Sequence, residues 1–218
     1  QNPLKNDNHS TVTYASGNEA VAQVAADGTV TAKKSGTATI TATSTKTGTT
    51  PVFASYTVTV KRELTVADLT VTAEPKTYDG TTAAKVSAVL TNPEDENDSV
   101  KAEVTAAFTD PNAGENKPVS YEITGLSGKD AGKYVLADSM QGNTVGTVSK
   151  AIVMVICPET TTRTYNGEPQ KVDLTAMAGG KMLESSMYQI TYDGQPEARN
   201  VGTYPIALTL TPQADQNY

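Results

Sequence analysis

Apolar and polar residues alternate with a period of two along much of the chain. In residues 36–43, Ala38, Ile40 and Ala42 fall on one face of an extended segment, and threonines occupy the positions between them. A period of two places successive side chains on opposite faces of a β-strand, and β-branched threonine favours that conformation. The same alternation recurs at residues 55–61, 101–108, 118–124 and 202–211. The pattern predicts half-buried β-strands throughout the chain.

Turn signals separate these segments. In each of them glycine follows Asp, Asn or Ser. Both residue types favour turns, since glycine accepts a positive φ and a short polar side chain can bond its own backbone. No window of eleven or more residues shows clean helical periodicity, and residues 179–187 are the best candidate for a short helical turn. An all-β fold of stacked sandwiches is therefore predicted. The turn signals are Asp27-Gly28, Ser35-Gly36, Asp79-Gly80, Ser127-Gly128, Asn166-Gly167 and Asp193-Gly194.

Two landmarks recur at nearly equal spacing, which indicates a repeated module. Thr-Tyr-Asp/Asn-Gly occurs at Tyr78 and again 87 residues later at Tyr165, and the glycines of two further matching segments, Gly114 and Gly202, are 88 residues apart. Short polar links at residues 61–63 and 150 complete the division. We expect three domains, 1–62, 63–150 and 151–218. The second copy stops at a tyrosine after which the first copy continues with a strand-like segment, so the third domain is expected to lack its last strand here.

The motifs resemble three kinds of bacterial module. Residues 12–60, with VTYASGNEAVAQVAADGTVTAKKSGTATITAT and the closing ASYTVTV, resemble the bacterial immunoglobulin-like group 2 domain, with its first strand weak or missing before Ser10. Residues 64–150, with KTYDGTT, GLSGKDAGKYVL and VSKA, are similar to the YDG domain of bacterial surface proteins. Residues 151–218, with RTYNGEPQKV, YQITYDG, NVGTYPIALTL and DQNY, resemble the MBG-type domain of adhesin-like proteins. The resemblance implies tandem immunoglobulin-like β-sandwiches in an extended arrangement, in a secreted protein or one attached to the bacterial cell surface or cell wall.

The repeated tyrosine motif has a structural and a functional interpretation. In the structural one, the rings pack beneath the turns made by Asp79-Gly80 and Asn166-Gly167 and fix one end of each sandwich. In the functional one, Tyr78 and Tyr165 bind sugar rings. Since a motif that recurs with its domain usually serves the domain, we favour the structural interpretation. A further Thr-Tyr-Asp-Gly at residues 191–194 falls outside the repeat register, so these four residues alone do not identify a repeated domain.

Composition excludes several classes of partner. The net charge of −7 and the pI near 4.8 argue against nucleic acids and anionic membrane surfaces as ligands. The longest apolar run, Ala151 to Cys157, is far shorter than a membrane span and has the length of one buried strand. Cys157 cannot form an intramolecular disulfide, and we expect it to be a small buried residue on a strand. The chain opens at Gln1 without signal-peptide features, as expected of a processed product or an excised segment.

The sequence offers few candidates for chemistry. It has one histidine, His9, one cysteine, no Gly-x-Ser-x-Gly and no phosphate-binding loop, so we expect no enzyme and no organic cofactor. The run 92–99 contains four carboxylates, which are calcium-type oxygen ligands but lack the spacing of a known calcium loop. A solvated loop surface is the alternative. The four calcium candidates are Glu94, Asp95, Glu96 and Asp98.

Two functions remain open at the level of the sequence. The first is a non-catalytic stalk or spacer, whose partners are neighbouring domains of a longer chain. The second is direct adhesion to a host protein or glycan through loop tips or sheet edges. The absence of tryptophan and the presence of only two phenylalanines, Phe53 and Phe108, weigh against glycan binding. A Lys-Asn isopeptide cross-link is a further hypothesis that the sequence does not place.

Overall fold

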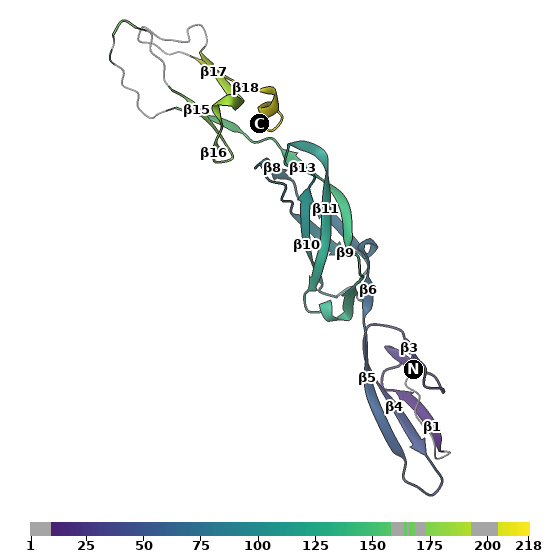
Figure 1. Cartoon of the computed structure of the whole chain (residues 1–218). Coiled ribbons are helices and arrows are strands. Elements are labelled where there is room, and N and C mark those ends of the chain that lie inside the picture. Colours follow the sequence, from purple (N-terminus) through teal and green to yellow (C-terminus); the bar gives the residue numbers. More distant parts are fainter. Residues whose placement is uncertain (1–9, 158–163, 165, 169–172, 193–204) are drawn as a thin grey trace. The chain divides into compact units, whose positions relative to one another are not determined.

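The computed structural model describes residues 10–157, 164, 166–168, 173–192 and 205–218, and β-strands dominate this part of the chain (Figure 1). The only helical elements in the described ranges are three 3₁₀ turns, η1 (Val66–Asp68), η2 (Ala131–Lys133) and η3 (Ser185–Met187), and the single-turn α1 (Pro212–Asp215). The turn expected within 179–187 is therefore reduced to η3. The all-β prediction is confirmed. The strands are β1 (Thr11–Ser16), β2 (Ala22–Val24), β3 (Val30–Ala32), β4 (Gly36–Thr45), β5 (Val52–Val60), β6 (Arg62–Leu64), β7 (Leu69–Ala73), β8 (Lys76–Thr77), β9 (Val86–Leu90), β10 (Lys101–Phe108), β11 (Gly114–Ser127), β12 (Tyr134–Leu136), β13 (Gln141–Ser149), β14 (Val153–Ile156), β15 (Thr175–Ala178), β16 (Lys181–Met182), β17 (Tyr188–Tyr192) and β18 (Ile206–Leu210).

The chain divides into two compact units. The N-terminal unit comprises residues 1–71, 88–104 and 122–142, and the C-terminal unit comprises residues 72–87, 105–121 and 143–218. The limits of the units fall inside β7, β9, β10, β11 and β13. Each unit thus combines one end of the chain with part of the segment that the sequence assigns to the middle domain. The division into domains 1–62, 63–150 and 151–218 stays a prediction.

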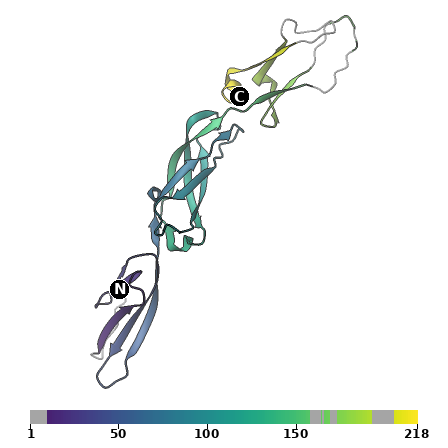
Figure 2. The same cartoon turned by 180° about the vertical axis from the view of Figure 1, so that it is seen from behind.

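A three-stranded antiparallel sheet and a short hairpin form the first part of the N-terminal unit. The sheet has the order β1-β4-β5, and β2 pairs with β3. β4 and β5 lie side by side in both views (Figure 1, Figure 2). Ala38 and Ile40 are buried and the threonines between them are not, so the predicted alternation places the apolar face correctly. Val21 packs against this face and faces Gly36, where an added Cβ would lie 2.8 Å from Val21 Cγ2.

The middle segment contains a four-stranded sheet of order β10-β11-β13-β8. Its core in the C-terminal unit is a cluster of Phe108, Val119 and Val148, with Ala73 and Val86 among the side chains packed against it. In the N-terminal unit, β6 and β12 form a parallel pair, and Leu64 of β6 and Tyr134 of β12 are buried. The apolar faces predicted for residues 101–108 and 118–124 supply core residues to both units: Phe108 and Val119 to the C-terminal unit and Ile123 to the N-terminal unit.

The last segment consists of sheet β14-β15-β16 and the pair β17-β18. Ala176, Ala178 and Leu183 form its core with Ala151, and Leu208 packs against them. The apolar run from Ala151 is only half buried, because alternate side chains face solvent; Ile152, just before β14, is 82% exposed. The expected burial of Cys157 is wrong. β14 ends at Ile156, so the thiol lies beyond the last paired residue and is exposed.

Gly146 of β13 is predicted to be intolerant of a side chain. An added Cβ would lie 3.0 Å from Ala73 Cβ and 3.1 Å from Phe108 Cε1, both in the core cluster. Overpacking of this kind costs about 1–3 kcal/mol, so Gly146→Ala should lower the free energy of unfolding by that amount. Gly132→Ala is the matched control, because nothing lies within 4 Å of its added Cβ. Chemical denaturation of both variants tests this, and equal stabilities would contradict it.

Candidate functional site

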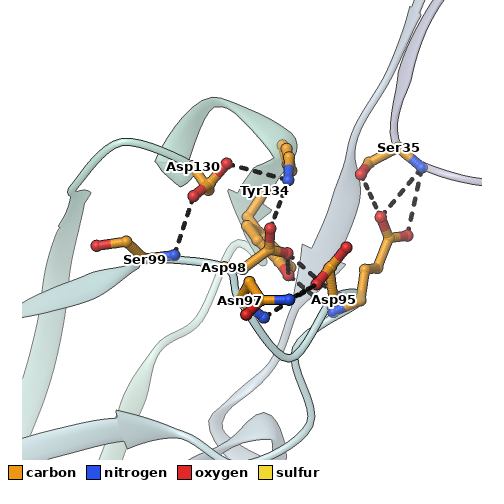
Figure 3. A network of polar contacts seen from close by, with 9 residues as sticks. Ser35, Asp95, Asn97, Asp98, Ser99, Asp130 and Tyr134 are labelled. Carbon is orange, nitrogen blue, oxygen red and sulfur yellow. Dashed lines mark hydrogen bonds and ion pairs between the residues drawn. The ribbon is translucent and has the colours of Figure 1, made fainter.

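The acidic loop of residues 92–99 is ordered by its own hydrogen bonds, in the N-terminal unit (Figure 3). Asp95 Oδ1 accepts bonds from the Asn97 backbone N–H at 2.9 Å and from Asn97 Nδ2 at 3.1 Å. The Asp98 N–H donates to the Asp95 carbonyl at 2.9 Å. The bond from the Asn97 backbone is the main cause that lowers the pKa of Asp95. The loop is therefore a folded turn that remains charged at neutral pH.

Asp98 joins this loop to η2 and β12. Its carboxylate accepts a 2.6 Å bond from the Tyr134 hydroxyl and pairs with Lys133, which also contacts Asp130 Oδ1 at 3.0 Å. The Lys133 ammonium is the main cause that lowers the pKa of Asp98, and the two carboxylates raise the pKa of Lys133. The buried Tyr134 hydroxyl also accepts a 2.8 Å bond from the Glu94 N–H, and burial raises its pKa. The phenol is thus held from both sides.

Glu94 ties the loop to the turn between β3 and β4. Its carboxylate accepts the Ser35 N–H, at 3.2 Å and 3.3 Å for the two oxygens, and also the Ser35 hydroxyl (Figure 3). The sequence predicted a turn at Ser35-Gly36 but gave no signal of this contact. The two residues are 59 positions apart, and nothing local marks either as the partner of the other.

Arg62 holds the beginning of the loop. Its Nη1 donates to the Asn92 carbonyl and its Nη2 donates to Asp68 Oδ1 at 2.8 Å. Asp68 in turn caps η1, because its carboxylate accepts both the N–H and the hydroxyl of Thr65. At the far end, the Ser99 N–H donates to Asp130 Oδ2 at 3.0 Å. Residues 92–99 are therefore anchored at their start, middle and end, and we call this set of contacts the acidic-loop brace.

The four calcium candidates lie in this loop, and most of them belong to the acidic-loop brace. Glu94, Asp95 and Asp98 use their carboxylates in the bonds just described, and Glu96 is exposed. Within the described ranges, no three His, Cys, Asp or Glu side chains form a group suited to a metal ion. Calcium binding by these four residues stays a prediction.

The first Tyr-Asp-Gly motif forms a tight turn in the C-terminal unit. Lys76 Nζ lies 2.7 Å from Asp79 Oδ1 and contacts Thr81 and the Ala83 carbonyl, while Asp79 Oδ1 accepts the Thr81 N–H at 2.8 Å. Gly80 has φ +77°, which glycine adopts readily. The Lys76 ammonium is the main cause that lowers the Asp79 pKa to about 2. The turn is thus stabilised by hydrogen bonds and an ion pair among residues of the motif itself.

The Tyr78 side chain packs against other side chains of the C-terminal unit. Its ring meets that of Tyr218 edge-on, with centroids 5.4 Å apart, and contacts both core clusters of the C-terminal unit. An edge-to-face pair of this kind is worth about 0.5–1.5 kcal/mol beyond area burial. This packing is the arrangement that the structural interpretation expects, and that interpretation stays a prediction.

The second copy is described only in part. Tyr165 lies outside the described residues, as do Asp193 and Gly194 of the last turn signal. Asn166 and Gly167 are exposed; Asn166 Oδ1 accepts the Glu168 N–H at 3.0 Å and Gly167 has φ +80°. The same side-chain-to-backbone turn therefore follows both tyrosines.

Asn217 provides a second set of bridging contacts. Its Oδ1 accepts the Ala113 N–H at 2.9 Å, its Nδ2 lies 3.2 Å from Asn112 Oδ1, and its carbonyl accepts the Ala151 N–H at 2.9 Å. Lys150 Nζ donates to the Asp215 carbonyl nearby. These contacts, which we call the Asn217 brace, join residues between 65 and 105 positions apart. Sequence reasoning noted the DQNY ending but not this role.

Asp79 gives a prediction about pH. Its folded pKa of about 2 is below the value of about 3.9 for an unfolded chain, so the ionised form stabilises the fold. That stability is complete above about pH 4 and is lost as the pH falls toward 2. Asp79→Asn should therefore be less stable than the wild type at pH 6 and equally stable near pH 2. Urea unfolding across this range tests it; a difference that does not change with pH would contradict it.

The comparisons with known proteins identify the class of the domains. The fold is that of immunoglobulin-like β-sandwiches, and residues 2–54 match the family model of the bacterial Ig-like domain (group 2). Residues 59–142 match the family model of the YDG domain, so the two domains follow each other in the expected order. These matches are consistent with a non-catalytic module of a surface protein. No curated protein matches the chain.

One solved structure shows a distant similarity. It is a chain titled Protocadherin Gamma B2 extracellular cadherin domains 3-6, with 15% identity and a TM-score of 0.28. The match covers 85% of this protein and 53% of the solved chain. A similarity of this strength does not bear on function. In the part of the chain that the structure describes, no helix has the length and apolar character to cross a membrane.

Proposed function

We propose that the chain is a non-catalytic spacer segment of a bacterial cell-surface, adhesin-like protein, located outside the cell. It consists of three sandwiches, 1–62, 63–150 and 151–218, and the third is of the MBG type. The observation that supports this best is that a brace accompanies each link between the proposed domains. Glu94 and Ser35 connect residues on either side of the first link, and Asn217 and Asn112 do so for the second.

The links themselves are short. One residue, Lys61, separates β5 from β6, and three residues separate β13 from β14. A link of this length leaves little freedom between consecutive domains, unlike a glycine-rich tether. The bonds of the two braces restrict the remaining freedom further. A spacer requires restricted freedom of this kind between consecutive domains.

Direct adhesion is the second candidate, and β5 favours it. β5 is an edge strand of nine residues without charge or proline, and Phe53 and Tyr56 on it are exposed. Natural edges are usually protected by charges, as on β10, where Lys101 and Glu103 occur. An unprotected edge can accept an extended peptide of a host protein as an added strand.

A binding screen separates the two functions. The chain is tested against arrays of host glycans and host proteins, together with a Phe53→Lys variant in β5 and a Val145→Lys variant in β13 as the matched control at another exposed position. The spacer proposal predicts no saturable binding. Saturable binding that Phe53→Lys abolishes and Val145→Lys preserves would overturn it in favour of adhesion.

A further inference from the structure

Two parallel strand pairs connect the beginning of the middle segment to its end. β6 pairs in parallel with β12 over three residues, and the Ala137 N–H extends this ladder to the Leu64 carbonyl at 2.9 Å. β8 pairs in parallel with β13 over two residues, and the Tyr78 N–H extends that ladder to the Ser149 carbonyl at 2.8 Å. In each pair, the earlier strand is nearer to Lys61 in the sequence and the later strand is nearer to Lys150.

The direction of these strands determines how they respond to a stretching force. A pull applied before β6 and after β13 draws the earlier strand toward its N-terminal end and the later strand toward its C-terminal end. In a parallel pair these ends are opposite, so the strands slide past each other and all their hydrogen bonds are loaded together. Strands pulled from the same end would instead separate one bond at a time.

We propose that β6–β12 and β8–β13 are load-bearing clamps, and that residues 62–149 resist tension along the chain through them. The inference rests on the proposed spacer function, since only a segment that connects two ends transmits such a force. It adds a mechanical role that neither family match assigns. The force is applied through the polypeptide on both sides of the segment.

The side chains on the first clamp support this role. On β6, Leu64 is fully buried and Arg62 is held by Asp68 and by the Asn92 carbonyl. On β12, the Tyr134 hydroxyl bonds both Asp98 and the Glu94 N–H. The polar contacts of Arg62 and Tyr134 lie at the N-terminal ends of the two strands, where peeling of a parallel pair would begin. The acidic-loop brace therefore keeps β6 and β12 in register while they are loaded.

The second clamp is fixed in a similar way. Lys76 of β8 is held by Asp79, Thr81 and the Ala83 carbonyl, and its side chain is largely covered. Val148 of β13 is buried in the core cluster with Phe108. The first Tyr-Asp-Gly turn thus anchors the strand that carries tension, which gives this motif a mechanical reason to follow β8 directly.

Single-molecule pulling in two directions tests the proposal on the full chain carrying Cys157→Ser. Handles on Lys61→Cys and Ile152→Cys, both exposed positions, load the middle segment in shear. Handles on Lys61→Cys and Gly132→Cys flank the N-terminal ends of β6 and β12 and peel that pair. Because the paired residues of both clamps share the load in shear and separate one at a time in peeling, we expect the shear unfolding force to be severalfold higher than the peeling force. Equal forces, or a lower force in shear, would overturn the proposal.

A side-chain variant supplies a second test. Tyr134→Phe removes the hydroxyl that bonds Asp98 and Glu94 and keeps the ring. We expect a lower shear unfolding force, whereas Tyr188→Phe in the last segment should leave it unchanged. An unchanged shear force in Tyr134→Phe would contradict the role of the acidic-loop brace. These outcomes are separate from those of the spacer proposal, because a binding screen that favoured adhesion would leave the ratio of the two forces as it is.

Discussion

Phe108→Ala is expected to destabilise the chain by about 3–5 kcal/mol, the usual loss when a buried phenylalanine is truncated. Phe108 is 3% exposed and forms the centre of a core cluster with Val119 and Val148, against which Ala73 and Val86 pack. The rigid β-strands around the ring cannot collapse into the space it leaves. Calorimetry of the variant should show a transition shifted to lower temperature.

The other phenylalanine of the chain provides the control. Phe53 lies on the edge strand β5 and is 75% exposed, so Phe53→Ala removes little buried area. Surface substitutions of this kind usually change stability by about 0.5 kcal/mol or less. A Phe108→Ala variant as stable as Phe53→Ala would show that the core is placed wrongly.

Leu64→Ala is expected to cost about 2–5 kcal/mol, since it removes a fully buried leucine. Leu64 has no exposed surface, and its carbonyl accepts the Ala137 N–H in the β6–β12 ladder. Losing the side chain leaves a cavity behind the short parallel pair. Chemical denaturation followed by circular dichroism measures the effect.

Val135→Ala on the partner strand is the control for Leu64→Ala. Val135 is 45% exposed and faces Glu63 across the same ladder. Its truncation should therefore have a much smaller effect than that of Leu64. Equal losses from the two variants would mean that β6 does not contribute its side chain to the core.

The fold class could be predicted because strand alternation is a local property. The spacing of Ala38 and Ile40 against the threonines placed their apolar face correctly, and the glycines at Asp27-Gly28, Asp79-Gly80 and Asn166-Gly167 have the positive φ that such turns use. The motifs also pointed to the two domain types whose family models match. Cys157 shows the limit of this reasoning, because an apolar run does not reveal where strand pairing ends.

The bridging contacts could not be predicted in the same way. Glu94 is 59 positions from Ser35, and Asn217 is 104 positions from Ala113, so no local pattern joins them. The acidic run 92–99 is recognisable by its charge, but its partners Lys133 and Tyr134 come from a different segment. The same holds for the parallel clamps. Pairing between strands far apart in the chain depends on topology, which the alternation of one strand does not encode.

Small-angle X-ray scattering on the monomer, recorded with calcium and with a chelator, tests the central claim most directly. A compact globule of 218 residues has a radius of gyration of about 17 Å. Three sandwiches in line, about 110 Å long from strands rising about 3.3 Å per residue, should give roughly 30 Å. The spacer account predicts the larger value, unchanged by calcium. A value near that of the globule, or one that reaches the larger value only with calcium, would contradict it.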